Sequence, residues 1–350
     1  MAVRVVCFNG VVFEHDPYPP QSWNDVMATV VKTLTLVEQE QRHIRGLLAE
    51  ILGEPGMTDQ YLFMDQAALY AQELPRRVRE AFYSFKRREE AAVLLVRGNP
   101  VLEQGAGPSP ARHIELDADY RLNDAKILHG LYGSLLGEGI GFTSQRGGSL
   151  YNNIVPLQGY STIANSSGGS SLEFGFHVED AFHPARAEYL GLVCMRNDER
   201  AATTIASIDG IALNAEEKQV LFEPRFRIAH NPIHSTSDVV EENYQAILFG
   251  HPDAPYVKIN AATLDLDDYQ GIERQALEKL LRHFAEQRVA LVLEATDCVY
   301  VDNYRCVHAR DSFQANYGEG ARWLARVVFA SSLRKSRDMR TSVGTRAINA

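Results

Sequence analysis

The sequence predicts an α+β fold in which helices buttress an antiparallel β-sandwich or jelly roll. Helical periodicity dominates about residues 20–140, and short apolar runs separated by turn residues dominate about residues 150–335. Runs of the second kind are typical of antiparallel sandwiches and jelly rolls. Because no linker-like segment divides the two parts, we expect a single domain over residues 1–350.

The helical part is predicted from apolar periodicity and from breaker residues. An amphipathic helix is expected at about 23–52, where apolar residues recur every three or four positions. A second helical region covers about 59–90 and contains Pro75 as a break. Residues 92–96 have the composition of a buried strand, and helix returns at about 122–137 before a cluster of glycines.

The β part is predicted from apolar runs of strand length. One amphipathic helix, at about 267–287, interrupts these runs. The main expected strands are Tyr189–Met195, Ala202–Ile208, Phe226–Ala229, Ala246–Phe249, Val289–Leu293, Cys298–Val301 and Trp323–Phe329.

The charge balance argues against nucleic acid as the main partner. The formal net charge is -10, whereas binding to a polyanion requires clustered cations. The densest basic run, Arg76–Arg88, contains one acidic residue and is followed by two more, so we expect a solvated helix face. A small molecule is therefore the expected partner, and the sequence does not predict the oligomeric state.

Cysteine usage and hydropathy indicate the compartment. The four cysteines form no CxxC pair and are expected to be buried thiols outside any disulfide framework. The N-terminus does not have the pattern of a signal peptide, and no apolar stretch approaches the roughly 20 residues that span a bilayer. We therefore expect a soluble, cytoplasmic protein with no membrane partner.

Two histidines and one glutamate form a candidate iron site. His177 and Glu179 lie two positions apart on an extended segment, which turns both side chains to the same side, and His308 can join them from a distant strand. Two nitrogens and one carboxylate on one face of an octahedron mark the non-haem iron(II) oxygenases. Arg322 is expected to pair with a carboxylate of a co-substrate bound beside the metal.

The stretches around these residues resemble one enzyme family. HVEDAFHPARAEYLGL, VDNYRCVHARDSF and RWLARV are similar to the clavaminate synthase-like branch of the Fe(II)/2-oxoglutarate-dependent oxygenases. The likeness runs from about Leu74 to Arg326. It is strongest to free-amino-acid hydroxylases such as the arginine hydroxylase of viomycin biosynthesis and asparagine oxygenase. The resemblance implies a double-stranded β-helix core, Fe(II), 2-oxoglutarate as co-substrate, and O2.

The resemblance also implies roles for individual residues, position by position. The implied residues are His177, Glu179 and His308 for iron, Arg322 and Thr204 for the far carboxylate of 2-oxoglutarate, and Arg326, Gln145, Ser167 (or its neighbour Ser166) and Glu179 for the amino-acid substrate.

The substrate side chain is expected to be polar and neutral. In the arginine-specific relative, two aspartates clasp the guanidinium, and this sequence has Asn260 and Ala262 at the matching positions. An unpaired buried cation is costly, whereas the Asn260 amide can both donate and accept for a citrulline, glutamine or asparagine side chain. Arginine or lysine stays the alternative, with Asp253 or Asp265 supplying the negative charge.

We therefore expect a hydroxylase of a free L-amino acid that supplies a building block for a non-ribosomal peptide or a similar natural product. Glu179 indicates hydroxylation and not chlorination, because halogenating relatives have a small residue there. One alternative is a hydroxylase of an amino acid tethered to a carrier protein. An alternative from a different class is a non-catalytic jelly-roll binding protein. The presence of all three candidate iron ligands together with Arg322 argues against it.

Overall fold

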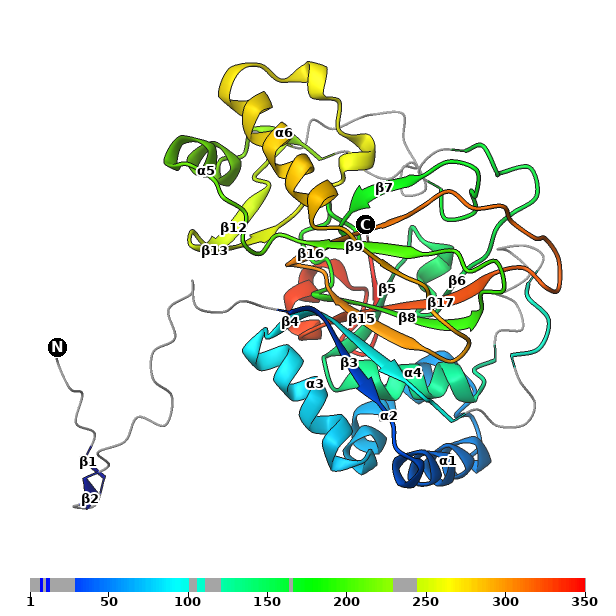
Figure 1. Ribbon diagram of the computed structural model, residues 1–350. Helices are drawn as coiled ribbons and strands as arrows, with labels where there is room; N and C mark the ends of the chain where they lie inside the picture. The colour runs from blue at the N-terminus through cyan, green and yellow to red at the C-terminus, as the bar shows by residue number, and fades with distance from the viewer. Residues whose placement is uncertain are drawn as a thin grey trace.

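Two β-sheets face each other, and helices cover the outer face of each sheet (Figure 1). Both sheets have open edges, so they form a sandwich and not a closed barrel. The α+β prediction is confirmed at this level. The structure is a computed structural model that describes residues 7–8, 11–12, 29–100, 106–110, 121–163, 166–228 and 244–349.

The larger sheet has the strand order β18-β5-β17-β8-β15-β4-β3, and β6 also pairs with β17. Its side chains alternate between two apolar cores: Leu94 and Val96 pack among the helices, whereas Val93 and Leu95 pack toward the second sheet. The strands are β3 (Thr29–Thr35), β4 (Ala91–Arg97), β5 (Glu138–Phe142), β6 (Asn152–Ile154), β8 (Tyr189–Arg196), β15 (Cys298–Asp302), β17 (Trp323–Ala330) and β18 (Ala347–Ile348).

The smaller sheet has the order β14-β9-β16-β7 and is antiparallel throughout. Ile205 and Cys306 face the larger sheet, whereas Ala206 and Val307 face outward to the helices. This alternation turns His308 toward the space between the sheets. The strands are β7 (Phe174–His177), β9 (Thr203–Ser207), β14 (Val289–Leu291) and β16 (Cys306–Arg310).

Helices from different parts of the chain cover opposite faces of the sandwich (Figure 1). The larger sheet is covered by α1 (Glu38–Gly53), α2 (Gln60–Tyr70), α3 (Arg76–Arg88) and α4 (Asp124–Ser134). The smaller sheet is covered by α5 (Ala215–Phe222) and α6 (Gly271–Glu286), and α6 confirms the helix predicted at 267–287. The remaining elements are the 3₁₀ helices η1 (Ala71–Glu73), η3 (Arg146–Gly148), η5 (Ala261–Thr263), η6 (Leu266–Asp268) and η7 (Leu333–Met339), and the short strands β1 (Cys7–Phe8), β2 (Val11–Val12), β10 (Phe226–Arg227), β11 (Tyr244–Gln245), β12 (Leu248–His251) and β13 (Ala254–Val257).

The helix predicted at 23–52 is wrong over residues 29–35, and residues 23–28 lie outside the described part of the chain. Residues Thr29–Thr35 form β3, which runs parallel to β4, and α1 begins only at Glu38. The segment TVVKTLT is rich in β-branched residues, which favour a strand when a partner strand is available. Pro75 precedes the first residue of α3, where a missing N–H leaves no helical hydrogen bond unmade.

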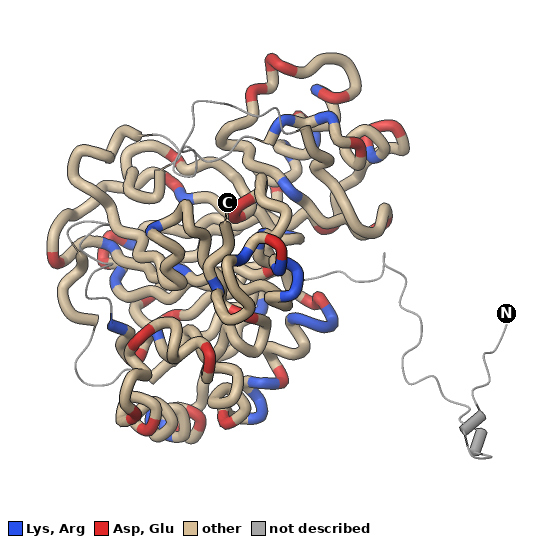
Figure 2. Tube along the Cα trace, turned by 180° about the vertical axis from the view of Figure 1, so that it is seen from behind, with Lys and Arg blue, Asp and Glu red and all other residues tan. Residues whose placement is uncertain are grey.

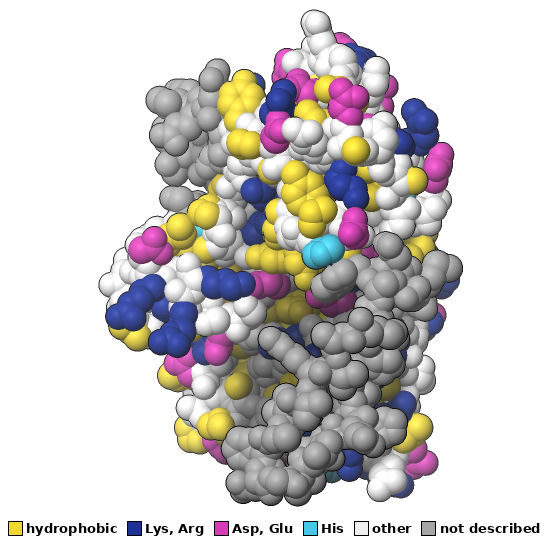
Figure 3. Space-filling view, turned by 90° about the vertical axis from the view of Figure 1, so that its left-hand side faces the viewer, with side chains coloured by type: hydrophobic (Ala, Val, Ile, Leu, Met, Phe, Trp, Pro, Cys, Tyr) yellow, Lys and Arg dark blue, Asp and Glu magenta, His cyan; other side chains and the backbone are white. Residues whose placement is uncertain are grey.

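The basic run of α3 is a solvated helix face, as predicted. Arg76 pairs with Glu80 in the same helix at 2.7 Å, and Arg88 pairs with Glu90 at 3.3 Å. Acidic residues lie beside basic ones along the trace in Figure 2, and acidic side chains lie beside basic ones on the face shown in Figure 3. Among the described residues, no helix combines the length and the apolar composition that crossing a membrane requires.

Candidate metal centre

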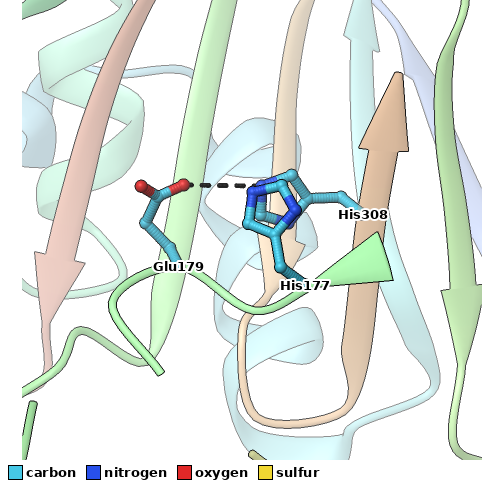
Figure 4. A group of neighbouring side chains, drawn as sticks. All are labelled: His177, Glu179 and His308. Atoms are coloured by element: carbon cyan, nitrogen blue, oxygen red, sulfur yellow. Dashed lines mark ion pairs between the residues drawn. The ribbon is translucent and has the colours of Figure 1, made fainter. Parts of the chain in front are cut away.

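His177, Glu179 and His308 converge between the sheets, as the sequence predicts (Figure 4). His177 ends β7 and lies directly opposite His308 of β16, and their ring centroids are 4.2 Å apart. Glu179 follows two residues after β7, and its Oε2 lies 3.4 Å from His308 Nε2. One potential ligand atom from each residue lies within 4.8 Å of the others. The backbone pairing of β7 with β16 therefore brings together ligands that are far apart in the sequence.

The segment that carries Glu179 is held by a side chain that the sequence analysis did not single out. The Asn303 Oδ1 accepts from the Glu179 N–H at 2.7 Å, and the Asn303 amide donates to the Glu179 carbonyl at 3.1 Å. The Val178 N–H donates to the Ile259 carbonyl at 2.9 Å. These bonds fix the chain after β7, so Glu179 stays on the same side as His177. Asn303 lies in the stretch VDNYRCVHARDSF, only five residues before His308.

The protonation states of these residues fit a divalent metal ion. Burial and the neighbouring His308 lower the pKa of His177 to about 3, so its ring is neutral near pH 7. Its Nδ1 lies 2.8 Å from the Gly175 carbonyl, which leaves Nε2 to face the ligand set. Burial opposes ionisation of Glu179, but Arg326 and His308 bring its pKa below the ordinary value. A neutral His177 ring, the second imidazole of His308 and one carboxylate form a ligand set that fits iron(II).

A cavity opens from this triad toward two buried arginines. Arg322 and Arg310 both line it, and their guanidinium carbons lie 5.7 Å and 5.6 Å from the ring centroid of Phe313. Burial lowers the pKa of Arg322 to about 10, and burial with the nearby Arg322 does the same to Arg310, so both remain cationic near pH 7. This end of the cavity therefore suits a carboxylate.

The structure places Thr203 at the cavity wall and not Thr204, which the sequence predicts for the keto acid. Thr203 lines the cavity, whereas Thr204 does not, and the Thr204 hydroxyl donates to Asp311 at 3.0 Å. The register of β9 explains the difference. Thr203 lies opposite Arg310, and Ile205 lies opposite the inward-facing His308, so the side chain between them points to the other face.

The residues that the sequence predicts to bind the amino-acid substrate also line the cavity. Arg326 extends from β17 on the same side as Arg322, and its Nη1 donates to Glu179. Gln145, just before η3, accepts from Arg326 Nη2 at 2.9 Å. Ser167 lines the wall, whereas the Ser166 hydroxyl accepts from the Gly168 N–H and Ser166 is not part of the lining.

Asn260 and Ala262 line the cavity beside the triad. The backbone of Asn260 forms an isolated antiparallel β-bridge with that of His177. The buried side-chain Oδ1 of Asn260 has no hydrogen-bond partner among the described residues. Glu179 and Asp180 are the only carboxylates that the described part of the chain contributes to the lining. Asp253 instead pairs with Lys218 at 3.3 Å, and Asp265 accepts from the Asp267 N–H. Neither of these aspartates lines the cavity.

Arg310 and Asp180 are among the lining residues that sequence reasoning missed. Arg310 lies two positions after His308 on the same strand, so strand alternation turns both side chains inward. The inward direction of Arg310 could therefore have been predicted from the sequence. Asp180 directly follows Glu179 and has a left-handed backbone with φ +52°. Burial and Glu179 raise its pKa above the ordinary value for an aspartate. No periodicity predicts its inward side chain.

The model of the taurine catabolism dioxygenase TauD, TfdA family matches residues 89–328. The chain is 32% identical to enduracididine beta-hydroxylase of Streptomyces hygroscopicus, over 90% of this chain and 99% of that protein. It is 30% identical to L-asparagine oxygenase of Streptomyces coelicolor, over 72% of this chain and 74% of that one. The crystal structure of the non-haem iron oxygenase OrfP with Fe, succinate and (3S)-hydroxy-L-Arg superposes with a TM-score of 0.82. Its sequence is 28% identical, and the match covers 91% of this chain and 99% of OrfP.

Proposed function

Because this chain belongs to the TauD, TfdA family of dioxygenases, we propose that it hydroxylates an unactivated C–H bond of a free L-amino acid in natural-product, non-ribosomal peptide, biosynthesis. It is a clavaminate synthase-like member that uses Fe(II), 2-oxoglutarate and O2. The two facing sheets are consistent with a double-stranded β-helix core. The observation that carries the proposal is the convergence of His177, Glu179 and His308 beside a cavity that contains arginines at its walls.

The proposed iron ligands are His177, Glu179 and His308. Iron with its keto acid supplies the oxidising chemistry that attacks the C–H bond. The protein residues hold the reactants in orientation and exclude water, and the burial of all three ligands supports this role. Because Glu179 is present as a third protein ligand, the proposed outcome is hydroxylation and not chlorination.

The proposed site of the 2-oxoglutarate far carboxylate is the end with Arg322 and Thr203. The buried guanidinium can bind a carboxylate through two parallel hydrogen bonds, and its Nε has no partner among the described residues. Arg310 adds a second positive charge next to Arg322. A five-carbon keto acid with charges at both ends satisfies this arrangement better than a monocarboxylic keto acid does.

The proposed site of the amino-acid head group is Arg326 with Gln145 and Ser167. Arg326 lies between the triad and Gln145, so a substrate carboxylate bound there holds the adjacent carbons close to the metal ligands. Glu179 contributes negative charge on the same side, which favours the substrate ammonium group.

The proposed side chain is polar and neutral, as in citrulline, glutamine or asparagine. The unpartnered Oδ1 of Asn260 is an acceptor that a ureido or amide N–H would satisfy, and an unmet buried acceptor costs about 1–3 kcal/mol. The aspartates considered for a cationic substrate, Asp253 and Asp265, have partners elsewhere. An L-asparagine oxygenase among the relatives supports a neutral amide substrate.

A cationic substrate such as arginine or lysine is the second candidate. The specific observation in its favour is the OrfP complex with hydroxy-arginine and the relation to enduracididine beta-hydroxylase. Asp180 is the described lining carboxylate that could face such a cation.

The test is mass spectrometry of products from the twenty proteinogenic amino acids plus citrulline and ornithine, with Fe(II) and 2-oxoglutarate. The expected result is a mass gain of one oxygen atom for a neutral amide or ureido amino acid, with succinate formed in step. Turnover of arginine or lysine alone would reject the neutral side chain. Succinate formation that no amino acid stimulates would reject the amino-acid hydroxylase itself.

A further inference from the structure

We propose that Asp180 is a positioning residue that fixes the side-chain amide of Gln145 with its oxygen toward Arg326 and the bound amino acid. The inference rests on the proposed function, because it concerns the place where the head group of the amino acid binds. Asp180 lies within the family-like stretch HVEDAFHPARAEYLGL, but the role proposed for it rests on its contacts in this structure.

The three side chains form a continuous chain of contacts along the cavity wall. The Gln145 Nε2 donates to Asp180 Oδ1 at 2.8 Å, and the Arg326 Nη2 donates to Gln145 Oε1 at 2.9 Å. Asp180 and Gln145 are 9% and 8% exposed, so water competes little for these bonds. Arg326 also donates to Glu179, the residue before Asp180, so this series of hydrogen bonds leads back to the proposed iron ligands.

Hydrogen-bond chemistry allows only one orientation of the central amide. A guanidinium only donates, and the Asp180 oxygen that receives Gln145 accepts. The amide between them can satisfy both neighbours only when its NH2 faces Asp180 and its oxygen faces Arg326. In the reverse orientation, two donors would face each other at Arg326 and two acceptors at Asp180, and both bonds would be lost.

The fixed orientation of the Gln145 amide determines which groups of the amino-acid substrate can bind beside it. Next to the guanidinium of Arg326, which suits a carboxylate, the wall offers a carbonyl oxygen, which suits a donor. An α-ammonium group beside an α-carboxylate matches that pair. If the amide were free to turn, its NH2 would face the ammonium group, and the pair would lose its preference for a free amino acid.

The backbone at Asp180 makes a conservative test available. Its φ is +52°, a left-handed conformation that asparagine tolerates about as well as aspartate. Asp180→Asn therefore keeps the backbone and the shape. The new amide can donate to or accept from Gln145, so position 180 no longer determines how the Gln145 amide is turned, and only Arg326 still favours the original orientation.

The experiment measures amino-acid binding without turnover. Enzyme loaded with Fe(II) and 2-oxoglutarate is titrated anaerobically in a calorimeter with L-citrulline, L-glutamine, L-asparagine, L-arginine and L-lysine, and the tightest binder is used for all variants. For Asp180→Asn we expect about tenfold weaker binding of that amino acid, with the Kd for 2-oxoglutarate unchanged. Gln145→Glu alone brings two carboxylates together and is expected to bind the amino acid more weakly still.

The double variant Asp180→Asn/Gln145→Glu distinguishes orientation from mere structural support. The new asparagine donates to the new glutamate, which again presents an acceptor to Arg326, and the net charge of the pair is unchanged. We expect binding to return to within about threefold of the wild type. Thermal unfolding of each variant verifies that the fold is intact.

Each outcome decides a separate question. Wild-type binding that persists in Asp180→Asn, or a double variant no better than the single ones, would overturn the positioning role while leaving the proposed function in place. A wild-type enzyme that binds none of the probes would overturn the proposed function and this inference with it.

Discussion

The two ends of the cavity are built in different ways. The end proposed for the metal and the keto acid is carried by strands: His177 ends β7, His308 lies within β16, and Arg322 immediately precedes β17. The end proposed for the substrate side chain is carried by Asn260 and η5, which lie outside the two sheets. Strand register holds the first set, whereas turns hold the second.

This difference explains which chemistry is shared among relatives and which is particular to this chain. Ligands on paired strands cannot shift by one residue without turning to the opposite face, so the reaction chemistry is tied to the fold. Turn residues can change identity without disturbing a sheet, so substrate choice can vary there. Variants at the two ends should therefore fail in different ways.

The largest effect is expected at the strand-borne end. His308→Ala leaves two ligands for iron, so we expect turnover to fall by on the order of a thousandfold or more. Product mass spectrometry and the iron content of the purified protein measure this. His183→Gln is a matched control, because His183 is a buried histidine near the site that does not line the cavity. Normal iron binding by the His308 variant would contradict the assignment.

The next largest effect is expected at the buried arginine. Arg322→Met removes the cation proposed to hold the far carboxylate, and we expect the KM for 2-oxoglutarate to rise about hundredfold. The KM for the amino acid should change much less. Arg322→Lys keeps the charge but loses the planar fork, so its effect should lie between the two. Equal changes in both KM values would show that the two ends are not separable.

A smaller effect is expected at the turn-borne end, where a substitution should change the substrate preference of the enzyme and not abolish its turnover. Asn260→Asp introduces a carboxylate of the same shape beside the cavity. We expect the ratio of kcat/KM for arginine to that for citrulline to rise about tenfold. Asn260→Ala is the control, since it should lower turnover of the neutral substrate without any gain for arginine. An unchanged ratio in the aspartate variant would place side-chain recognition elsewhere.

The smallest effect separates two adjacent threonines. Thr203→Val removes a hydroxyl from the cavity and should raise the KM for 2-oxoglutarate about fivefold. Thr204→Val should leave that KM unchanged and lower the free energy of unfolding by about 1 kcal/mol, because it loses the bond to Asp311. Steady-state kinetics and urea unfolding measure the two effects. The reverse pattern would restore the sequence-based choice of Thr204.

Much of the strand-borne end could be predicted from the sequence. His177, Glu179, His308 and Arg322 were identified because ligand chemistry and motif spacing are local signals in the chain. The sequence-based choice of Thr204 differs from the lining in the structure, because the inward face of β9 depends on its register against β16, and a shift of one residue reverses the face.

Other features depend on tertiary contacts that no local pattern contains. Residues 29–35, predicted as helix, form a strand because β4 provides a partner for them. Asp180, whose own backbone is left-handed, faces the cavity directly after Glu179, which also faces it. Asn303 supports Glu179 across 124 positions of sequence. Such contacts become visible only when the sheets are assembled.

The most direct test of the central claim is anaerobic addition of Fe(II) and then 2-oxoglutarate to the purified protein, followed by visible absorption spectroscopy. The prediction is one iron per chain and a weak visible charge-transfer band that appears only when both are present and is absent in His308→Ala. A wild-type protein that binds no stoichiometric iron, or that shows no band with the keto acid, would contradict the assignment of these strands to an iron and 2-oxoglutarate site.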